Sequence, residues 1–536
     1  MATPTSSTES LSPTRPFRVI IAGAGAAGLC FSHALQRAGI DHVVLEKGVV
    51  APDWGASISL WGNGARILSQ IGCMDALEAE APPLRMLHVR GPDGKVFCEE
   101  PFFDMMLERN GFECLTMERK HFLRIVHEQI PDKSFIKTGK RVVDVIDNDD
   151  GVIVKLQDGT QEEGDMLIGC DGVHSTVREL MWRDANLAQP DYITTQEKRS
   201  MVTTYRSLVG VAKTVPGIGL QCMNWVCHSG LSFLILVQPD KTYFFVNWKM
   251  PQKMRWPSKA KWSNEEAERA AASVVELPIS DSTVFGELWK HKIRAHLIGL
   301  EEGIFEHWHH GRMALAGDSV HKMTPNFALG AMCALESATV LINGIHDMHS
   351  TLGPGQHPTK SQISRMFQRY QEERMPRIKA AFDATALITR MHACDGPYHW
   401  FAMRCVFPAT GMKPYADALG HLCSGAPKIK FLPVEYKKSA TIKWQDEPDH
   451  VPGKESMRPF KWGKGRNDFA MDFASILSFI FLVFFVCGSV LDRSLSNSSS
   501  LGGLADDLLL RRGAQVRNTT SFRSGSQPNF SPIAGV

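Results

Sequence analysis

The sequence predicts an α/β fold, with a Rossmann-like domain, a β-sheet domain inserted into it and a transmembrane helix near the C-terminus. Three observations predict this arrangement. A glycine motif joins an apolar strand to a helix near residue 20, short alternating strands run from Ser200 to Met250, and an uncharged stretch spans Phe473 to Leu491. At 536 residues the chain is also too long for one simple core.

The first element is an apolar strand that begins at Phe17 and runs into the motif G-x-G-x-x-G, formed by Gly23, Gly25 and Gly28. The first glycine allows a tight turn, the second lets the backbone approach a pyrophosphate, and the third lets the helix pack on the strand. The next strand ends at Glu46, 21 residues beyond Gly25, where a carboxylate can bind a ribose. Together these features predict a dinucleotide site rather than a chance glycine-rich turn.

Two further strand-and-turn motifs follow. A strand ending at Gly169 leads into Asp171-Gly172 and the start of a helix. Later, a strand ending in Gly317-Asp318 precedes a proline loop and a helix from about Gly330.

In this order, the three motifs resemble those of the single-component flavoprotein monooxygenases typified by para-hydroxybenzoate hydroxylase. Residues 51–58, 301–303 and 317–326 look like the fungal branch that acts on meroterpenoids and indole diterpenes, often as epoxidases. The resemblance covers about residues 17–444. It implies FAD as cofactor, NADPH or NADH as reductant, and dioxygen as co-substrate.

The resemblance also implies a role for each matching position. The expected FAD-binding residues are Gly23, Gly25, Gly28, Glu46, Ser59, Arg119, Asp171, Asp318 and Ala331. Glu46 would bind the ribose, Asp318 the ribityl-pyrophosphate part, and Ala331 would lie beside the flavin ring. Asp171 would serve FAD packing and the NAD(P)H side, with a helix cap as the alternative. Two departures stand out, because Ser59 replaces a glycine and the sequence Ala-Leu-Gly-Ala-Met at 328–332 replaces Gly-Gln-Gly-Ala-Asn.

Alternation between Ser200 and Met250 predicts a sheet that roofs a substrate pocket. By resemblance, Arg206 stands where the family often places an arginine facing the flavin, and Tyr243 lies near a second polar position. These two are the catalytic candidates, with a plain surface arginine as the alternative for Arg206. Aromatic and methionine side chains on the strands favour a bulky, lipophilic small-molecule substrate, although such side chains are also common in ordinary cores.

The composition excludes several classes. A net charge of +2 without a basic run interleaved with aromatic residues argues against a nucleic-acid partner. The twelve cysteines show no C-x-x-C spacing, which favours reduced, mostly buried thiols and no metal site.

The C-terminal apolar stretch predicts a membrane-spanning helix over residues 469–491, since 19 uncharged residues suffice to cross the hydrocarbon layer. A buried C-terminal helix is the alternative. Basic residues before the stretch favour a cytoplasmic catalytic part, most simply on the endoplasmic reticulum. The tail would then carry its two glycosylation sequons, at Asn497 and Asn518, on the lumenal side.

The expected divisions are a disordered leader (1–16), the first part of the FAD-binding domain (17–185), the substrate-domain sheet (186–295), the return of the FAD-binding domain with a long helix (296–395), a C-terminal extension and juxtamembrane linker (396–468), the transmembrane helix (469–491) and a disordered tail (492–536). The expected function is an FAD- and NAD(P)H-dependent monooxygenase that epoxidises a prenyl or terpenoid alkene of a meroterpenoid intermediate. The alternatives are an aromatic-ring hydroxylase of the same family, a flavin reductase or dehydrogenase, and a catalytically weakened membrane-anchored flavin-binding protein.

Overall fold

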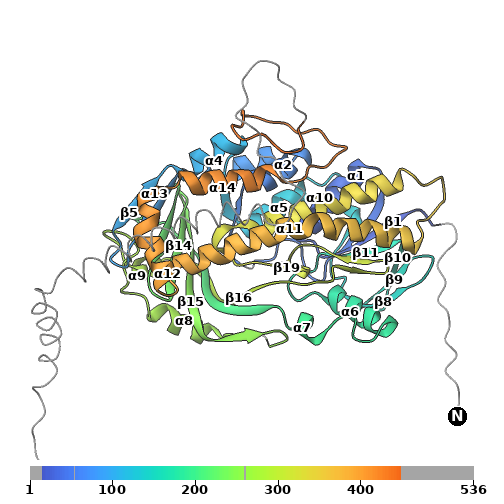
Figure 1. The fold of residues 1–536 in the computed structure, drawn as a ribbon, viewed down its shortest axis with the longest axis horizontal. Helices are drawn as coiled ribbons and strands as arrows, with labels where there is room; N and C mark the ends of the chain where they lie inside the picture. Colours follow the sequence, from blue (N-terminus) through green and yellow to red (C-terminus); the bar gives the residue numbers. More distant parts are fainter. Residues whose placement is uncertain (1–14, 54, 259–260, 448–536) are drawn as a thin grey trace, which may run out of the picture. The chain divides into compact units, whose positions relative to one another are not determined.

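The fold is described for residues 15–53, 55–258 and 261–447 of a computed structural model (Figure 1). These residues belong to one compact unit, Met1–Arg458. The predicted transmembrane helix, the tail with both sequons and all but the last two residues of the leader lie outside the described residues.

A six-stranded sheet carries the three predicted motifs. Its strands, in the order β17-β18-β11-β1-β2-β7, are β17 (His309–His310), β18 (Met313–Leu315), β11 (Met166–Gly169), β1 (Arg18–Ala22), β2 (Asp41–Leu45) and β7 (Ile136–Lys137). The central strand β1 pairs in parallel with β2 and β11. Its residues Val19, Ile20 and Ile21 are fully buried, as expected for a parallel strand covered on both faces.

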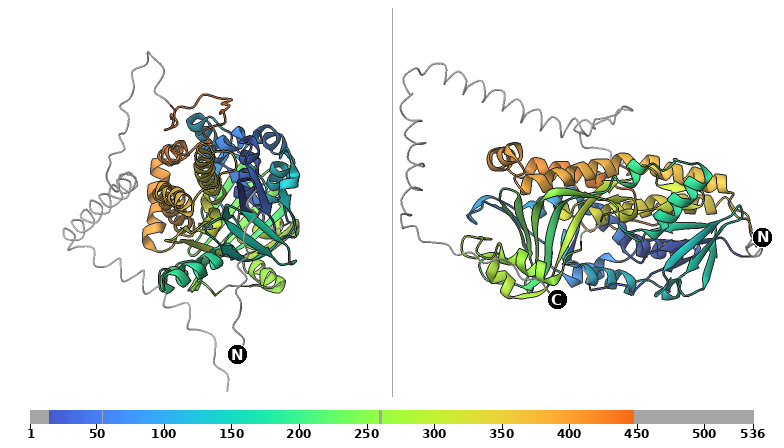
Figure 2. Two further views of the ribbon diagram at one scale, coloured as in Figure 1. Left: turned by 90° about the vertical axis from the view of Figure 1, so that its right-hand side faces the viewer. Right: turned by 90° about the horizontal axis from the view of Figure 1, so that it is seen from below.

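Long helices pack beside this sheet. Helix α1 (Ala26–Arg37) follows the glycine motif and contacts α10 (Leu329–His349), which in turn packs along α11 (Lys360–His392) (Figures 1 and 2). The sequence predicted a helix from about Gly330 and a long helix within 296–395, and both are present; Pro376 lies inside the long helix, α11.

Helix α10 is the only helix in the described part of the chain that is long and apolar enough to cross a membrane. About 78% of its most apolar window is buried inside the fold, as in the core helix of a protein.

A second, eight-stranded sheet forms the other side of the unit (Figure 2, right). Its strands, in the order β19-β16-β12-β15-β14-β13-β4-β5, are β19 (His321–Lys322), β16 (Lys292–Ile304), β12 (Val202–Lys213), β15 (Lys241–Arg255), β14 (Leu231–Val237), β13 (Cys222–Cys227), β4 (Met86–Arg90) and β5 (Val96–Glu100). The sheet predicted from the alternation over Ser200–Met250 is therefore present. The sheet also includes strands from outside 186–295: β4 pairs with β13, β5 pairs with β4, and β19 pairs with β16.

One face of this sheet packs on α8 (Asn264–Ala272) and α9 (Phe285–Lys290). That core contains Leu208, Phe233, Phe244 and Ala271, all 1% exposed or less. Because side chains alternate along a strand, the neighbouring residues point to the opposite face, toward the rest of the unit.

The remaining elements complete the two halves. They are β3 (Ser57–Leu60), β6 (Leu115–Glu118), β8 (Val142–Asp147), β9 (Val152–Leu156), β10 (Gln161–Gly164), α2 (Gly62–Gln70), α3 (Met74–Glu80), α4 (Phe102–Asn110), α5 (Arg119–Glu128), α6 (Thr176–Ala188), α7 (Thr195–Lys198), α12 (Pro397–Phe401), α13 (Phe407–Thr410) and α14 (Lys413–Ser424), with short 3₁₀ helices at Lys133–Phe135, Gly317–Ser319 and Pro325–Phe327 and a π-helical turn at Ala402–Val406. The described cysteines are all free thiols, and most are buried, as predicted.

Candidate active site

The glycine motif forms a backbone cradle between β1 and α1. Gly23 has a φ of +102°, and a β-carbon there would lie 2.5 Å from the Cys170 carbonyl oxygen. A β-carbon on Gly28 would lie 1.9 Å from the carbonyl oxygen of Gly23. A β-carbon on Gly25 would meet no protein atom within 4 Å, because Gly25 faces open space at the start of α1. These are the three roles that a dinucleotide site requires.

Two cavities meet at this cradle. The larger, here called the main cavity, has a volume of about 390 Å³, and the smaller, here called the nucleotide cavity, has about 170 Å³. Gly25, Arg119, Cys170 and Gly172 line both of them. The two cavities therefore form one path from the end of β2 to the start of α10.

Glu46 lines the nucleotide cavity immediately after β2. Its carboxylate accepts hydrogen bonds from the backbone N–H groups of Ala24 and Gly48, each at 2.9 Å. These bonds hold the carboxylate against the glycine cradle, at the position where the sequence predicts ribose binding.

Arg119 begins α5 and lies between two carboxylates. Burial lowers its pKa from the ordinary value, while Asp318 and Glu46 act in the opposite direction. The preceding residue, Glu118, is 3% exposed and pairs with Lys241 at 2.8 Å and Arg294 at 2.7 Å. The predicted FAD-binding arginine is thus joined through its neighbour to β15 and β16 of the second sheet.

Asp171 lines the nucleotide cavity and also caps α6. Its Oδ2 accepts hydrogen bonds from the N–H groups of Thr176 (2.7 Å) and Val177 (3.1 Å). Its buried Oδ1 has no hydrogen-bond partner among the described residues. The cap weighed as the alternative from the sequence is therefore present, and one oxygen remains unused.

Arg178 connects the Asp171 motif to the Gly317-Asp318 turn. It is fully buried and donates to the carbonyl oxygens of Ser319 (2.7 Å) and Val173 (3.0 Å). Trp182, Trp256 and Phe305 surround its guanidinium at 4.7 to 5.3 Å. Burial lowers its pKa to about 10. Arg178 is therefore a buried residue that holds the two turns together.

Asp318, Ala331 and Ser59 all line the main cavity. Asp318 lies in the turn after β18 and pairs with Lys322, and Ala331 lies in the first turn of α10. The hydroxyl of Ser59 is hydrogen bonded to that of Thr116 at 2.7 Å, which leaves its backbone at the cavity wall. The three positions expected near the flavin are thus brought together.

The second sheet supplies an apolar wall to the main cavity. The side chains that β12 to β15 contribute to it are Val209, Met223, Trp225, Leu234, Leu236 and Phe245. They alternate with the residues that pack on α8 and α9, as a sheet with two buried faces requires. The structure therefore confirms the prediction that this sheet covers a pocket.

Neither catalytic candidate lines the main cavity among the described residues. Arg206 lies on the same face of β12 as Leu208, away from Val209, and its guanidinium lies 5.5 Å from the centre of the Trp248 ring. Tyr243 is buried near Glu118, and burial raises its pKa well above the ordinary value. The register of β12 therefore places Arg206 on the wrong face to meet a cofactor in this cavity.

Two cavity residues were not singled out from the sequence. Trp61 donates from its indole N–H to the carbonyl oxygen of Phe327 (2.9 Å), and Asn326 lies in the proline loop. Asn326 lies at the end of the segment 317–326, which resembles the family. Its polar side chain just before a predicted helix was the signal that could have identified it. Trp61 follows the short strand β3, and its role depends on a contact with a residue 266 positions away.

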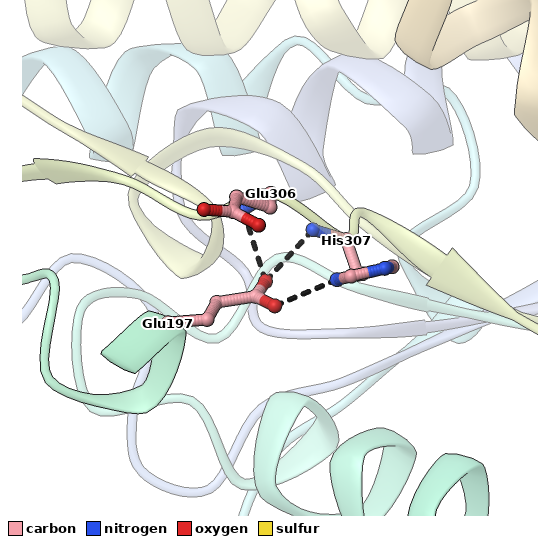
Figure 3. A group of neighbouring side chains, drawn as sticks. All are labelled: Glu197, Glu306 and His307. Carbon is pink, nitrogen blue, oxygen red and sulfur yellow. Dashed lines mark hydrogen bonds and ion pairs between the residues drawn. The ribbon is translucent and has the colours of Figure 1, made fainter. Parts of the chain in front are cut away.

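One group of side chains has the composition of a metal site, but its hydrogen bonds explain it differently (Figure 3). The buried carboxylate of Glu197 accepts from the N–H groups of Glu306 (2.9 Å) and His307 (2.8 Å), and its other oxygen lies 2.6 Å from His307 Nδ1. These bonds tie α7 to the segment after β16. The hydrogen bonds of this group are those of a structural contact between α7 and the segment after β16.

The donors and spaces described above fit an FAD molecule. An open position at Gly25, a carboxylate at the end of β2 and an unpaired buried oxygen on Asp171 suit the nucleotide end, and the start of α10 at the main cavity suits a flavin ring. The fold and the site together define a flavin-binding oxidoreductase.

Comparison with known proteins identifies the family. A family model described as "FAD binding domain" matches residues 17–385. The chain is 40% identical over 433 residues to the FAD-dependent monooxygenase DEP2 of Alternaria brassicicola, covering 80% of this chain and 82% of that protein. It is 34% identical over 420 residues to the FAD-dependent monooxygenase atmM of Aspergillus flavus, covering 78% of this chain and 87% of that one. The chain belongs to this family of FAD-dependent monooxygenases and is a flavin-dependent monooxygenase that uses FAD.

Solved structures agree on the fold. The Klebsiella pneumoniae protein HpxO, solved with FAD and uric acid, aligns with a TM-score of 0.63 at 21% identity, covering 77% of this chain and 97% of that one. A salicylate hydroxylase solved with its substrate aligns with a TM-score of 0.58 at 18% identity, covering 77% of this chain and 98% of that one.

Proposed function

We propose that this monooxygenase uses NADPH or NADH to insert one oxygen atom of dioxygen into a lipophilic secondary metabolite, by epoxidising a prenyl or terpenoid alkene of a meroterpenoid intermediate. A reduced flavin supplies the oxygen chemistry when bound. The chain's own residues orient the cofactor, hold the substrate and exclude water. The observation that carries the proposal is the apolar wall that β12 to β15 present to the main cavity.

The chemistry of that wall favours an alkene over a phenol ring as the reacting group. Ring hydroxylation is helped by a base that removes the phenol proton. Among the described residues, the side chains of β12 to β15 that line the cavity include no ionisable group; Glu301, which also lines the cavity, lies on β16, outside this wall. An alkene needs no deprotonation, so it suits this wall better.

The test uses the full-length protein, loaded with FAD and dissolved in detergent. A farnesylated phenol is added with NADPH or NADH under ¹⁸O₂, and the products are analysed by mass spectrometry and NMR. We expect one ¹⁸O atom in the product and the loss of an alkene signal. A product hydroxylated on the ring would favour the hydroxylase alternative, and a yellow protein that never consumes NAD(P)H would favour the scaffold.

We also propose that residues 469–491 anchor the enzyme in the membrane of the endoplasmic reticulum, with the catalytic part in the cytoplasm. The uncharged sequence and the preceding basic residues support this proposal. Full-length protein should stay in the membrane pellet after alkaline carbonate extraction, and glycosidase treatment should shift its mass through Asn497 and Asn518. Release into the supernatant would contradict the proposal.

A further inference from the structure

The wall of the main cavity includes a buried asparagine, Asn326, that contacts a buried histidine, His392. Asn326, in the turn Pro325–Phe327 before α10, lines the cavity and is 3% exposed. Its Nδ2 lies 3.4 Å from Nδ1 of His392, which is 1% exposed at the end of α11. The two residues are 66 positions apart, so only the packing of the proline loop on α11 brings them together.

The carboxamide of Asn326 is only partly used. Its Oδ1 is buried and has no hydrogen-bond partner among the described residues, and the same holds for Nε2 of His392. Leaving a buried polar group without a partner destabilises a fold, so native proteins rarely do so without a reason. In an enzyme, such a group is a candidate contact for a bound molecule.

The surroundings hold the pair in place. The His392 ring lies 4.1 Å from the ring of Trp225, which is part of the apolar wall. Beside the pair, the hydroxyls of Thr324 and Thr389 are 2.7 Å apart and join the same loop to the same helix. Burial lowers the pKa of His392 to about 3, so its ring is neutral near pH 7. One ring nitrogen of a neutral imidazole donates a hydrogen bond and the other accepts one.

We propose that the Asn326 carboxamide binds the hydroxyl group of an otherwise apolar substrate, and that His392 is a positioning residue that orients this carboxamide. The Nδ2 of Asn326 faces Nδ1 of His392, and its Oδ1 remains to accept a hydrogen bond from the ligand hydroxyl. Because Asn326 lies five residues before Ala331, the bound hydroxyl would be held close to the flavin end of the cavity. The inference rests on the proposed function for the class of substrate and adds how that substrate is oriented.

The test compares two probes, a farnesylated phenol and its methyl ether, on the full-length, FAD-loaded protein. Dissociation constants come from tryptophan fluorescence and from changes in the flavin absorption spectrum, so no turnover is required. The wild-type protein should bind the phenol roughly tenfold more tightly than the ether, the size expected for one hydrogen bond. Asn326→Ala should bind both probes equally.

Three further variants separate the roles. His392→Phe keeps a ring beside Trp225 but removes both nitrogens, and it should lose most of the discrimination between the probes. His392→Gln restores a hydrogen-bonding group and should recover part of it. The matched control, Met223→Leu on the apolar wall, should keep the ratio of the two dissociation constants even if both values change.

Several results would overturn the inference. One is an unchanged ratio in Asn326→Ala, and another is equal binding of both probes to the wild type. A loss of FAD affinity in Asn326→Ala would show that the carboxamide contacts the cofactor instead. Failure of the wild type to bind either probe would exclude a hydroxylated apolar substrate. If the ratio behaves as expected but no product gains oxygen, the proposed function fails and this inference stands.

Discussion

At the scale of single residues, the three glycines of the cradle differ in what limits them. Gly23 and Gly28 are limited by protein backbone, because an added β-carbon would overlap a carbonyl oxygen. Gly25 is limited only by the space that the cofactor needs, since no protein atom lies within 4 Å of a β-carbon there. Substitutions at Gly23 or Gly28 should therefore affect the stability of the fold, whereas a substitution at Gly25 should affect cofactor binding.

Gly25→Ala should leave the melting temperature of the FAD-free protein unchanged and weaken FAD binding by about tenfold or more, because the methyl group occupies the pyrophosphate position. Titration with FAD, followed by flavin fluorescence, measures the affinity. Gly28→Ala is the contrasting variant and should lower the melting temperature itself. Equal FAD affinity in Gly25→Ala and wild type would refute the assignment of this cradle.

A second residue-scale prediction concerns Ala328, which has a φ of +51° just before α10. A non-glycine residue in this left-handed region costs about 1–2 kcal/mol, and glycine costs about 0.5–1 kcal/mol in the entropy of the unfolded chain. Ala328→Gly should therefore raise the free energy of unfolding by about 0.5–1 kcal/mol. Chemical denaturation would measure the change, and a lower stability would show that the alanine methyl group has packing value that outweighs the strain.

At the scale of secondary-structure elements, α2, α10 and α11 are joined by one buried carboxylate. Glu336 is 1% exposed and is bonded to Arg374 (2.6 Å), Arg377 (3.0 Å) and Asn63 (2.8 Å). These contacts outweigh the effect of burial and lower its pKa from 4.5 to about 2. The pair of arginines would be left without a counter-charge if this carboxylate were removed.

Glu336→Gln should lower the free energy of unfolding by about 3–5 kcal/mol near neutral pH, as expected when one partner of a buried ion pair is removed. A carboxyl group with a depressed pKa in the folded state stabilises above its unfolded pKa of about 4.5 and loses that effect as the pH falls toward 2. The difference between the variant and wild type should therefore shrink over that interval. Glu372→Gln, on an exposed part of α11, is the control and should change little. A difference that is constant with pH would contradict this account.

At the scale of the whole unit, Glu118 links the cofactor side to the substrate sheet. It is the last residue of β6 and precedes Arg119, the arginine expected to bind FAD, while its partners Lys241 and Arg294 lie on β15 and β16. The main cavity is lined from both sides of this link. We expect this link to help keep water out of the cavity, which the oxygen transfer requires.

Glu118→Gln should weaken that closure without moving the glycine cradle. We expect an unchanged affinity for FAD and a higher share of NADPH consumption that ends as hydrogen peroxide instead of oxygenated product. Peroxide and product are measured in the same reaction. Lys290→Gln, which removes an exposed pair with Glu287, is the control. Equal product yields in both variants would show that the link has no part in closing the cavity.

The cofactor half of the site was predictable because it is built from contiguous segments. The turn at Gly23, the acid at Glu46 and the Asp318 turn each have a local backbone geometry that requires particular residues at fixed spacing. The order of these segments along the chain then sufficed to indicate the family, and the comparisons confirm it. The residues expected at the cofactor line the two cavities, except Gly28, whose close approach to the Gly23 backbone lets α1 pack on β1.

The substrate half was less predictable, as Arg206 illustrates. In a strand, adjacent residues point to opposite faces, and the pairing of β12 with both of its neighbours, β15 and β16, is irregular between Thr203 and Tyr205. Motif position alone does not determine which face a side chain takes after such a shift. The same limit applies to β4 and β5, which the chain contributes to the second sheet long before its other strands.

By itself, the sequence determined the α/β fold class, the dinucleotide cradle and the FAD-dependent monooxygenase family, because glycine geometry and helix starts are set by neighbours along the chain. Only the tertiary structure decided which side chains line the main cavity, and it joined Asn326, His392 and Trp225 from a loop, a helix and a strand. The physical reason is that contacts between distant segments depend on strand register and helix packing. Both are set by the burial of apolar surface across the whole unit and not by any short stretch of residues.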